Sequence, residues 1–411
     1  MTRSLSPFYL STRPSYRPII RRRHQRSCCS IRLFQTSRSN TSSRTPDFAF
    51  AFDIDGVLLR SSKPIAGAQK TLRYLQQHRI PFILLTNGGG KHELDRVAEL
   101  SDKLGVPLDV SMFVQSHTPF AELVADNSVS GGLRDKSILV VGGDGDKCRK
   151  VAEAYGFTNV VTPGDIFAAH PSIWPFSEVF HSYYKSFARP LPAPISPSST
   201  PSLQIDSIFV YNDPRDWALD AQIILDLLLS SRGILGSVSS KNNDPSLPNR
   251  GFQQDCQPPL YYSNPDLWWA AEYHLPRLGQ GGFREALEGL WAAVTGGPAR
   301  GVQLHKKIIG KPYHETYAFA ERRLSAHRKT LFGTRDIPSL QTVYMVGDNP
   351  ESDIRGANEF RSPSGSAWSS VLVRSGVFVG GEPSWKPKVI VDDVWQAMNW
   401  ALKASRWDAP D

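Results

Sequence analysis

The stretch that most constrains this chain is 48–59, FAFAFDIDGVLL, where an apolar run meets Asp53, Asp55 and Gly56. A continuous apolar run of this length, closed by Asp and Gly, predicts a buried parallel strand that ends in a functional loop. Residues two apart on an extended backbone point to the same side, so the two carboxylates lie together. Two like charges at so short a distance repel each other unless a cation or a shared proton reduces the repulsion. The pair therefore indicates a metal or acid–base chemistry. Ordinary turns and calcium loops also contain Asp-x-Asp-Gly, and on this stretch alone that alternative stays open.

The first 46 residues have the composition of a targeting segment. They contain ten Arg and ten Ser but no Lys and no acidic residue. Without those ten charges the net charge of +8 becomes −2, so the basic character of the chain is no indication of nucleic-acid binding. An Arg- and Ser-rich start without acidic residues is typical of a mitochondrial transit peptide, and we expect residues 1–46 to be one. The alternative is a disordered basic tail. The expected location of the mature protein is the mitochondrial matrix.

Apolar stretches of strand length alternate with helix-like segments along the rest of the chain. The expected strands cover 48–52, 82–85, 112–117, 138–141, 207–211, 260–263, 342–346 and 370–373. This alternation predicts a parallel α/β sheet, and a chain of 411 residues is expected to form two domains. The Pro- and Ser-rich stretches 188–202 and 239–259 are expected to be surface insertions. No stretch approaches 18 consecutive apolar residues, so no membrane span is expected.

Three further polar stretches stand at or beside the ends of apolar segments. They are Thr86-Asn87-Gly88, Gly310-Lys311-Pro312, and Gly347-Asp348 followed by Asp353. Taken singly, each has an ordinary structural explanation, as a helix N-cap, a helix start or a turn. In open α/β sheets, however, reactive groups lie just beyond the carboxyl ends of strands. We therefore expect these side chains to meet near Asp53 and Asp55.

In this order the four stretches resemble the four motifs of the haloacid dehalogenase (HAD) superfamily of hydrolases. Within its class IIA, the chain resembles the cat-eye-syndrome critical-region hydrolase subfamily over residues 48–403. The closer resemblance is carried by PIAGAQKTLRYL (64–75), LLTNGGG (84–90), VQSHTPF (114–120), NDPRDW (212–217), YSNPDLWWA (262–270), GQGGFR (279–284) and VGDNPESDIRGA (346–357). The resemblance implies a HAD-like Rossmannoid core formed by 47–134 and 302–411. It also implies an inserted α/β cap of the C2 type, formed by 135–301 and lengthened by the two Pro- and Ser-rich stretches.

The chemistry expected of these residues is phosphoryl transfer. Asp53 is expected to be the nucleophile that forms an aspartyl-phosphate, and Asp55 the general acid and base. Lys311 is expected to supply positive charge and to orient Asp53. A carboxylate facing a phosphate needs a cation, and Mg²⁺ prefers oxygen ligands. Its expected ligands are the carboxylates of Asp53, Asp348 and Asp353 and the main-chain carbonyl of Asp55. The residues expected to contact the substrate are Thr86, Asn87, Gly88, Asn264 and Asp266.

The sequence thus predicts a Mg²⁺-dependent HAD phosphatase that acts on a small phosphorylated metabolite. The subfamily resemblance also suggests a link to glycerophospholipid metabolism. Two alternatives remain on the sequence alone: a phosphomutase, and a non-catalytic mitochondrial binding protein that keeps the fold. A small phosphorylated substrate is the expected partner, without nucleic acid, and a homo-oligomer formed through the cap is also considered.

Overall fold

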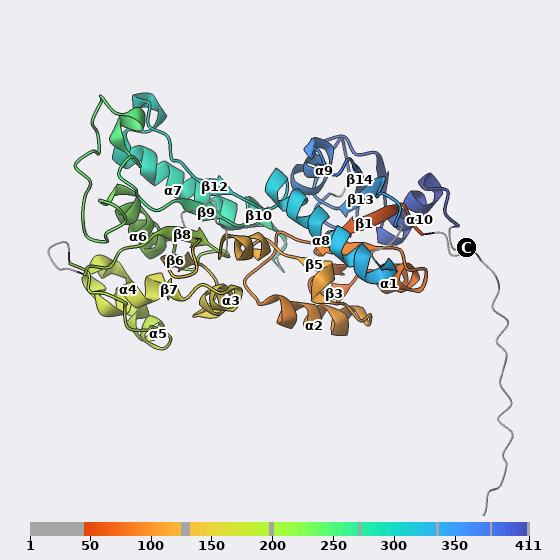
Figure 1. Cartoon of the computed structure of the whole chain (residues 1–411), viewed down its shortest axis with the longest axis horizontal. Helices are drawn as coiled ribbons and strands as arrows, with labels where there is room; N and C mark the ends of the chain where they lie inside the picture. Colours follow the sequence, from red (N-terminus) through yellow and green to blue (C-terminus); the bar gives the residue numbers. More distant parts are fainter. Residues whose placement is uncertain are drawn as a thin grey trace, which may run out of the picture. The chain divides into compact units, whose positions relative to one another are not determined.

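The computed structural model describes residues 45–124, 132–196, 201–269, 273–333, 337–378 and 380–408. The expected transit peptide therefore lies almost wholly outside the described residues. Residues 45–411 form one compact unit with two main parallel sheets. The expected parallel α/β architecture is confirmed (Figure 1).

The first sheet has six parallel strands in the order β15-β14-β13-β1-β4-β5. Their bounds are β1 (Phe48–Phe52), β4 (Phe82–Leu85), β5 (Phe113–Val114), β13 (Thr342–Gly347), β14 (Ala367–Val373) and β15 (Val389–Val391). Strand β1 lies in the interior of the sheet, with Phe50 opposite Tyr344 on one side and opposite Phe82 on the other. The N- and C-terminal parts of the chain therefore build one sheet, and their strand ends meet at one edge.

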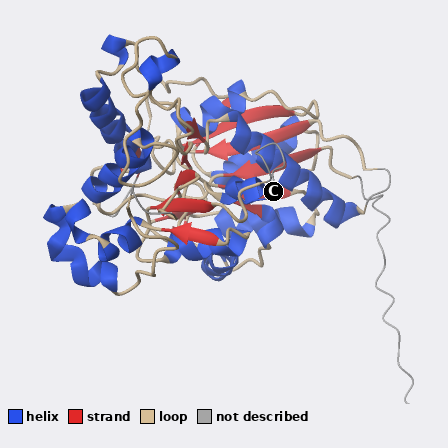
Figure 2. Ribbon diagram, turned by 60° about the vertical axis from the view of Figure 1, so that its left-hand side comes forward, coloured by secondary structure: helices blue, strands red, loops and turns tan. Residues whose placement is uncertain are grey.

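The two faces of β1 bury different side chains. Phe48, Phe50 and Phe52 belong to a core cluster that includes residues of helices α1, α2 and α10, whereas Ala49 and Ala51 belong to a cluster that includes residues of α8 and α9. The helix bounds are α1 (Ala68–Gln77), α2 (Glu93–Leu104), α8 (His314–Phe332), α9 (Arg355–Glu359) and α10 (Val394–Ala404). Helices thus cover both faces of the sheet, which is why β1 is apolar at every position (Figure 2).

The second sheet has five parallel strands in the order β12-β9-β8-β6-β7. Its strands are β6 (Ser137–Val141), β7 (Asn159–Val161), β8 (Ser207–Val210), β9 (Leu260–Tyr262) and β12 (Lys307–Ile308). The helices in this part of the chain are α3 (Lys147–Tyr155), α4 (Pro163–Ala169), α5 (His181–Lys185), α6 (Trp217–Leu229) and α7 (Gln280–Thr295). Because β12 pairs with β9, this sheet continues past the boundary expected at residue 301.

Shorter elements connect these layers. Two small antiparallel ribbons are formed by β2 (Leu59–Arg60) with β3 (Lys63–Pro64), and by β10 (Trp268–Trp269) with β11 (Arg277–Leu278). Short 3₁₀-helical segments are η1 (Val110–Met112), η2 (Thr118–Val124), η3 (Pro171–Ile173), η4 (Pro175–Phe180), η5 (Pro248–Gly251) and η6 (Pro298–Arg300), and η7 (Pro350–Ile354) is π-helical. Within the described ranges, no helix is both long and apolar enough to cross a membrane.

Candidate active site

Asp53 follows directly on β1, at the carboxyl end of the first sheet. Its backbone N–H donates to the carbonyl of Val346 at 2.9 Å, which continues the ladder between β1 and β13. The carboxylate is buried, and its Oδ1 accepts a hydrogen bond from Lys311 Nζ at 2.6 Å. Strand β1 therefore positions Asp53, and the segment that contains Lys311 completes the site.

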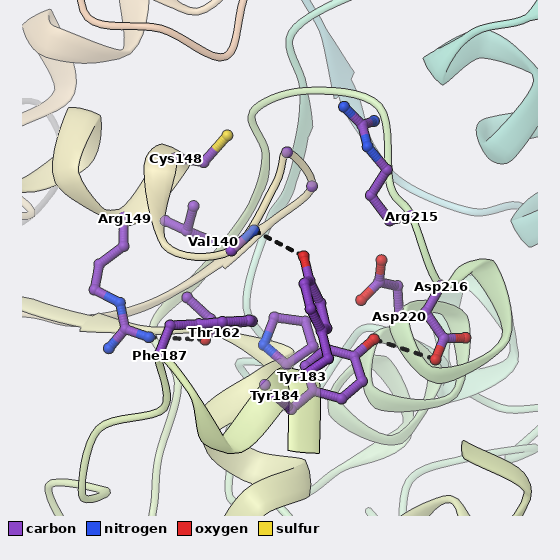
Figure 3. Close-up of a pocket in the computed structure, with 15 residues that line it drawn as sticks. Val140, Cys148, Arg149, Thr162, Tyr183, Tyr184, Phe187, Arg215, Asp216 and Asp220 are labelled. Carbon is purple, nitrogen blue, oxygen red and sulfur yellow. Dashed lines mark hydrogen bonds between the residues drawn. The ribbon is translucent and has the colours of Figure 1, made fainter. Parts of the chain in front are cut away.

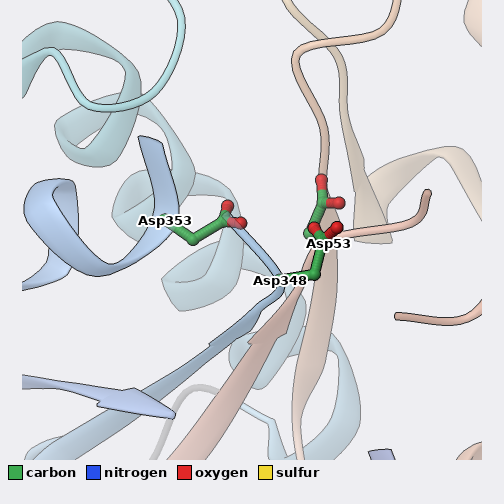
Figure 4. Close-up of side chains that lie close together, drawn as sticks. All are labelled: Asp53, Asp348 and Asp353. Carbon is green, nitrogen blue, oxygen red and sulfur yellow. The ribbon is translucent and has the colours of Figure 1, made fainter. Parts of the chain in front are cut away.

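Two more carboxylates approach Asp53 from the end of β13. Asp348 follows the strand, and Asp353 lies in the helical turn η7. One oxygen from each of the three carboxylates lies within 4.8 Å of the others, and all three residues are buried. Figure 4 shows them projecting from two neighbouring strand ends and from η7. The sequence expectation that Asp53, Asp348 and Asp353 meet at one place agrees with this geometry.

Backbone groups hold the two later carboxylates in place. The N–H of Val377 donates to Asp348 Oδ2 at 2.6 Å, and the N–H of Asn349 donates to Asp353 Oδ2 at 3.1 Å. The hydroxyl of Tyr317 on α8 donates to the carbonyl of Asp353 at 3.1 Å. Val377 and Tyr317 were not among the predicted site residues. The contribution of Val377 is a backbone group, which carries no side-chain signal.

Lys311 lies between two of the carboxylates. Its Nζ donates to Asp53 Oδ1 and to Asp353 Oδ1, at 2.6 Å in each case. Burial alone would lower the pKa of Lys311, but Asp353 and Asp53 outweigh burial and the pKa is raised. Lys311 is therefore cationic, and one such cation among three carboxylates leaves an excess of two negative charges when all three are ionised.

This excess charge fits a divalent cation. Burial, together with Asp353 and Asp348, raises the pKa of Asp53 well above its ordinary value, against the opposing effect of Lys311. Burial and the neighbouring Asp353 raise the pKa of Asp348 to about 7. Carboxylate oxygens are the ligands that Mg²⁺ prefers, and its charge would favour the ionised state of all three groups. The donor set therefore fits the expected metal.

Asp55 stands apart from the three carboxylates. It is exposed, and its Oδ2 lies 4.0 Å from the position that a Cβ at Gly88 would occupy. Surrounding protein raises the pKa of Asp55 by desolvation, and the charges of Arg96 and Lys311 oppose this effect. The side chain thus faces the Thr86–Gly88 loop at the accessible side of the site. Metal binding by its main-chain carbonyl stays a prediction.

The loop after β4 brings Thr86, Asn87 and Gly88 to the same edge of the sheet. Thr86 and Asn87 are buried, and Thr86 Oγ1 accepts a hydrogen bond from the N–H of Gly88 at 3.0 Å. Asn87 Oδ1 accepts from the N–H of Lys311 at 2.7 Å, and its Nδ2 donates to the carbonyl of Lys311 at 2.9 Å. The Asn87 side chain therefore fixes the backbone of Lys311. Because both of its polar atoms are engaged there, we expect Asn87 to contact the substrate through its own backbone N–H.

The loop after β9 contributes Asp266 from the second sheet. Asp266 Oδ2 accepts a hydrogen bond from Asn87 Nδ2 at 3.0 Å, while Asn264 Oδ1 accepts from the N–H of Asp266 at 2.8 Å. Burial raises the pKa of Asp266 to about 6 against the effect of the Asn87 hydrogen bond. Asp266 thus reaches the site, whereas the Asn264 side-chain oxygen holds the turn that positions it.

A small cavity lies elsewhere, at the end of β6 (Figure 3). Its lining includes Tyr183, Tyr184, Arg215 and Asp220, and none of the predicted site residues. Its volume of about 40 Å³ is room for a few water molecules and is too small for a phosphoester. The candidate active site is the three-carboxylate group, because it carries the charged side chains that the expected chemistry needs.

Comparison with known proteins agrees with the four motifs. A family model described as haloacid dehalogenase-like hydrolase matches residues 50–158, and a HAD-hydrolase-like model matches residues 308–397. A hypothetical protein of Pyrococcus horikoshii, solved by crystallography, has a similar fold with a TM-score of 0.52. It is 19% identical, and the match covers 86% of this chain and 99% of that one.

Two curated relatives match most of the chain. A mitochondrial hydrolase of Saccharomyces cerevisiae is 39% identical over 390 residues, which cover 90% of this chain and 98% of the relative. A cardiolipin synthase (CMP-forming)/mitochondrial hydrolase fusion protein of Schizosaccharomyces pombe is 40% identical over 370 residues. That match covers 89% of this chain, which spans only 55% of the fusion protein. On this likeness and these motifs, the chain belongs to the haloacid dehalogenase-like hydrolase family.

Proposed function

We propose that this hydrolase is a Mg²⁺-dependent phosphatase that acts on a small phosphorylated metabolite through an aspartyl-phosphate. The observation that carries the proposal is the buried contact of Lys311 Nζ with Asp53 and Asp353, beside Asp348. Lys311 occupies Oδ1 of Asp53, and within the described part of the chain no hydrogen bond is made to Oδ2. That oxygen is therefore the one we assign to nucleophilic attack.

The proposed reaction has two displacements. Asp53 attacks phosphorus, the bond from phosphorus to the leaving oxygen breaks, and Asp55 donates a proton to that oxygen. Asp55 then takes a proton from water, which attacks the same phosphorus and releases phosphate and the free Asp53 carboxylate. The exposed position and raised pKa of Asp55 suit a group that exchanges protons with a leaving group.

The remaining residues orient the substrate. Lys311 holds Asp53 and offsets its charge, and we expect Thr86 Oγ1 to donate to a phosphate oxygen. Mg²⁺, held by Asp53, Asp348 and Asp353 with the main-chain carbonyl of Asp55, would supply charge neutralisation on the phosphoryl oxygens. The second sheet would act as a cap from about residue 135 to Ile308, because Asp266 reaches Asn87 from it. We expect the Asn264–Asp266 loop to contribute specificity.

The test is phosphate release by the purified chain without its leader, against a broad panel of phosphorylated metabolites, with Mg²⁺ and with EDTA. Asp53→Asn is the matched variant. The proposal predicts metal-dependent turnover that Asp53→Asn abolishes. Isomerisation of a phosphorylated compound without phosphate release would instead indicate a mutase. Metal-independent turnover, or full activity of Asp53→Asn, contradicts the proposal.

We further propose a mitochondrial matrix location and a link to glycerophospholipid metabolism. The composition of residues 1–46 supports the location, as do the two relatives named as mitochondrial hydrolases. The fusion of one relative to a cardiolipin synthase supports the lipid link. Protease protection of the chain in intact and ruptured mitochondria tests the location. Turnover of glycerol phosphates, with none of unrelated sugar phosphates, would support the link, and the reverse would remove it.

A further inference from the structure

The VQSHTPF stretch, whose role the proposed reaction does not define, packs against the glycine loop after β4. The N–H of Gly90 donates to His117 Nε2 at 3.1 Å, and the N–H of Ser116 donates to the carbonyl of Gly88 at 3.2 Å. A Cβ at Gly89 would lie 2.6 Å from Ser116 Oγ. Only glycine therefore lets the loop approach this stretch so closely, and the contacts fix the backbone that carries Thr86.

A residue just after strand β8 of the second sheet also lies close to this loop. A Cβ at Gly90 would lie 2.9 Å from Asn212 Cγ. His117 Nδ1 lies 2.8 Å from the hydroxyl of Tyr155, which is on helix α3. Gly90 thus lies close to both His117 and Asn212, and His117 in turn contacts Tyr155 on helix α3.

The hydrogen bonds determine the tautomer of His117. A backbone N–H can only donate, so Nε2 must be the unprotonated acceptor for Gly90. Burial lowers the pKa of His117 to about 4, so the ring is neutral and its proton is on Nδ1. Nδ1 therefore donates to Tyr155 Oη, and the Tyr155 hydroxyl donates to Glu93. Thr118 Oγ1 donates to the same Glu93 oxygen at 2.8 Å. Each donor in this series of hydrogen bonds, from Gly90 to Glu93, therefore has an acceptor.

We propose that His117 is a positioning residue that holds the Thr86–Gly90 loop in its phosphate-binding form through the Gly90 N–H. The proposal rests on the proposed function, because the loop is taken to bind the transferred phosphoryl group. Without the Nε2 acceptor, the Gly90 N–H would lose its partner and the three consecutive glycines would be free to take other backbone conformations. Loss of this hydrogen bond would change the position of Thr86 indirectly, through the loop. His117 itself is not part of the group formed by Asp53, Asp348 and Asp353.

Two substitutions distinguish the contributions of the two ring nitrogens of His117. In His117→Gln the side-chain oxygen can take the place of Nε2 and accept from Gly90. In His117→Asn the shorter side chain reaches only the place of Nδ1, so it retains the contact with Tyr155 and loses that with Gly90. We expect His117→Asn to lower kcat/KM about tenfold or more and to raise the inhibition constant of inorganic phosphate, as misplaced binding groups do. His117→Gln is expected to stay within about threefold of the wild type in both quantities.

His78→Asn is the matched control, because His78 is exposed at the end of α1 and contacts Tyr74. It should leave both quantities unchanged. Thermal unfolding is followed in parallel, and all assays are run well below the transition. A histidine that serves stability alone would lower the transition temperature in both His117 variants without a change in kinetics. That result, or equal kinetic losses in His117→Gln and His117→Asn, overturns the proposal.

A second variant and a second measurement keep the two proposals separable. If His117→Asn does not fold, His117→Phe retains a ring but has no acceptor for the Gly90 N–H, and a loss of phosphate affinity in the same direction is expected. Binding of inorganic phosphate with Mg²⁺ is measured by calorimetry, which needs no turnover. A wild-type chain that binds phosphate but hydrolyses nothing contradicts the proposed function alone. Unchanged phosphate binding in every folded His117 variant that lacks an acceptor for the Gly90 N–H contradicts the positioning role.

Discussion

At the scale of single residues, the position of Asp348 leaves no space for a side chain at two neighbouring glycines. A Cβ at Gly56 would lie 2.3 Å from Asp348 Oδ2, and one at Gly376 would lie 1.9 Å from the same atom. Neither distance is compatible with a side chain, so both glycines are required by the position of the carboxylate. Gly56 also has a φ of 91°, which favours glycine independently.

Gly376→Ala should therefore move Asp348 away from the other two carboxylates. We expect Mg²⁺ affinity to fall about 10- to 100-fold, in the range seen when the support of a metal ligand is removed. Calorimetric titration with Mg²⁺ measures this. Gly289→Ala on α7 is the control, because nothing lies within 4 Å of its added Cβ. Unchanged affinity in Gly376→Ala would contradict the assigned role of Asp348.

Asp266 predicts a pH dependence of stability. Its pKa is about 6 in the folded chain and near 3.8 when unfolded, so folding favours the protonated form. The stability that this provides is present below pH 4 and is lost as the pH rises through 6. Asp266→Asn is neutral throughout, so its transition temperature should exceed that of the wild type increasingly between pH 4 and pH 7. Thermal unfolding in EDTA measures the difference, and a difference independent of pH would contradict the raised pKa.

The carboxylates were the part of the site most open to sequence reasoning. Asp53 and Asp348 each follow an apolar strand, and strand ends meet at one edge of a parallel sheet. The use of the Asn87 side chain to hold Lys311 was not foreseen, because it depends on two loops that are 224 residues apart. The role of His117 was not foreseen either, although the VQSHTPF stretch was noted. Long-range pairings of this kind leave no local pattern in the sequence.

At the scale of elements, β1 sets how closely helix α8 approaches the sheet. Ala49 and Ala51 are fully buried in the cluster shared with α8, while the phenylalanines fill the opposite face. Ala51→Leu adds volume to a packed layer and should destabilise the chain by about 1–3 kcal/mol. Urea unfolding measures this cost. Ala286→Leu on the exposed side of α7 should change the stability little, and an equal loss in both variants would contradict the packing argument.

Helix α8 shows why some elements were not predicted. It covers nineteen residues, His314–Phe332, for which the sequence analysis gave no element. Its buried face carries Thr316, Glu321, His327 and Arg328 beside Tyr317 and Leu324, so the apolar period is interrupted by polar side chains. The strands were easier to predict, because a strand buried on both faces is a continuous apolar run. Tertiary contacts bind part of this polar face: Arg328 Nη2 donates to the carbonyls of Pro46 and Pro338.

At the scale of the whole molecule, the site is assembled where two sheets contribute loops. The first sheet supplies Asp53, Thr86 and Asp348, and the segment after β12 supplies Lys311. The second sheet supplies Asp266, and its helix α3 supplies Tyr155. The family resemblance implied a second α/β layer, and the alternation of strands and helices predicted a parallel α/β sheet. It did not predict that the two-residue strand β12 joins the second sheet, because so short a strand has no periodicity.

The central claim is that Asp53 becomes covalently phosphorylated. The direct measurement uses a substrate found in the panel, acid quenching during turnover, and mass spectrometry of the peptide that contains 48–59. Asp55→Asn, which should slow hydrolysis of the intermediate, and Asp53→Asn are compared with the wild type. We predict a phosphoryl group on Asp53 in the wild type and more of it in Asp55→Asn, with none in Asp53→Asn. Turnover that continues in Asp53→Asn, or Mg²⁺-dependent turnover with no phosphoryl group on this peptide in the wild type or in Asp55→Asn, would contradict the account.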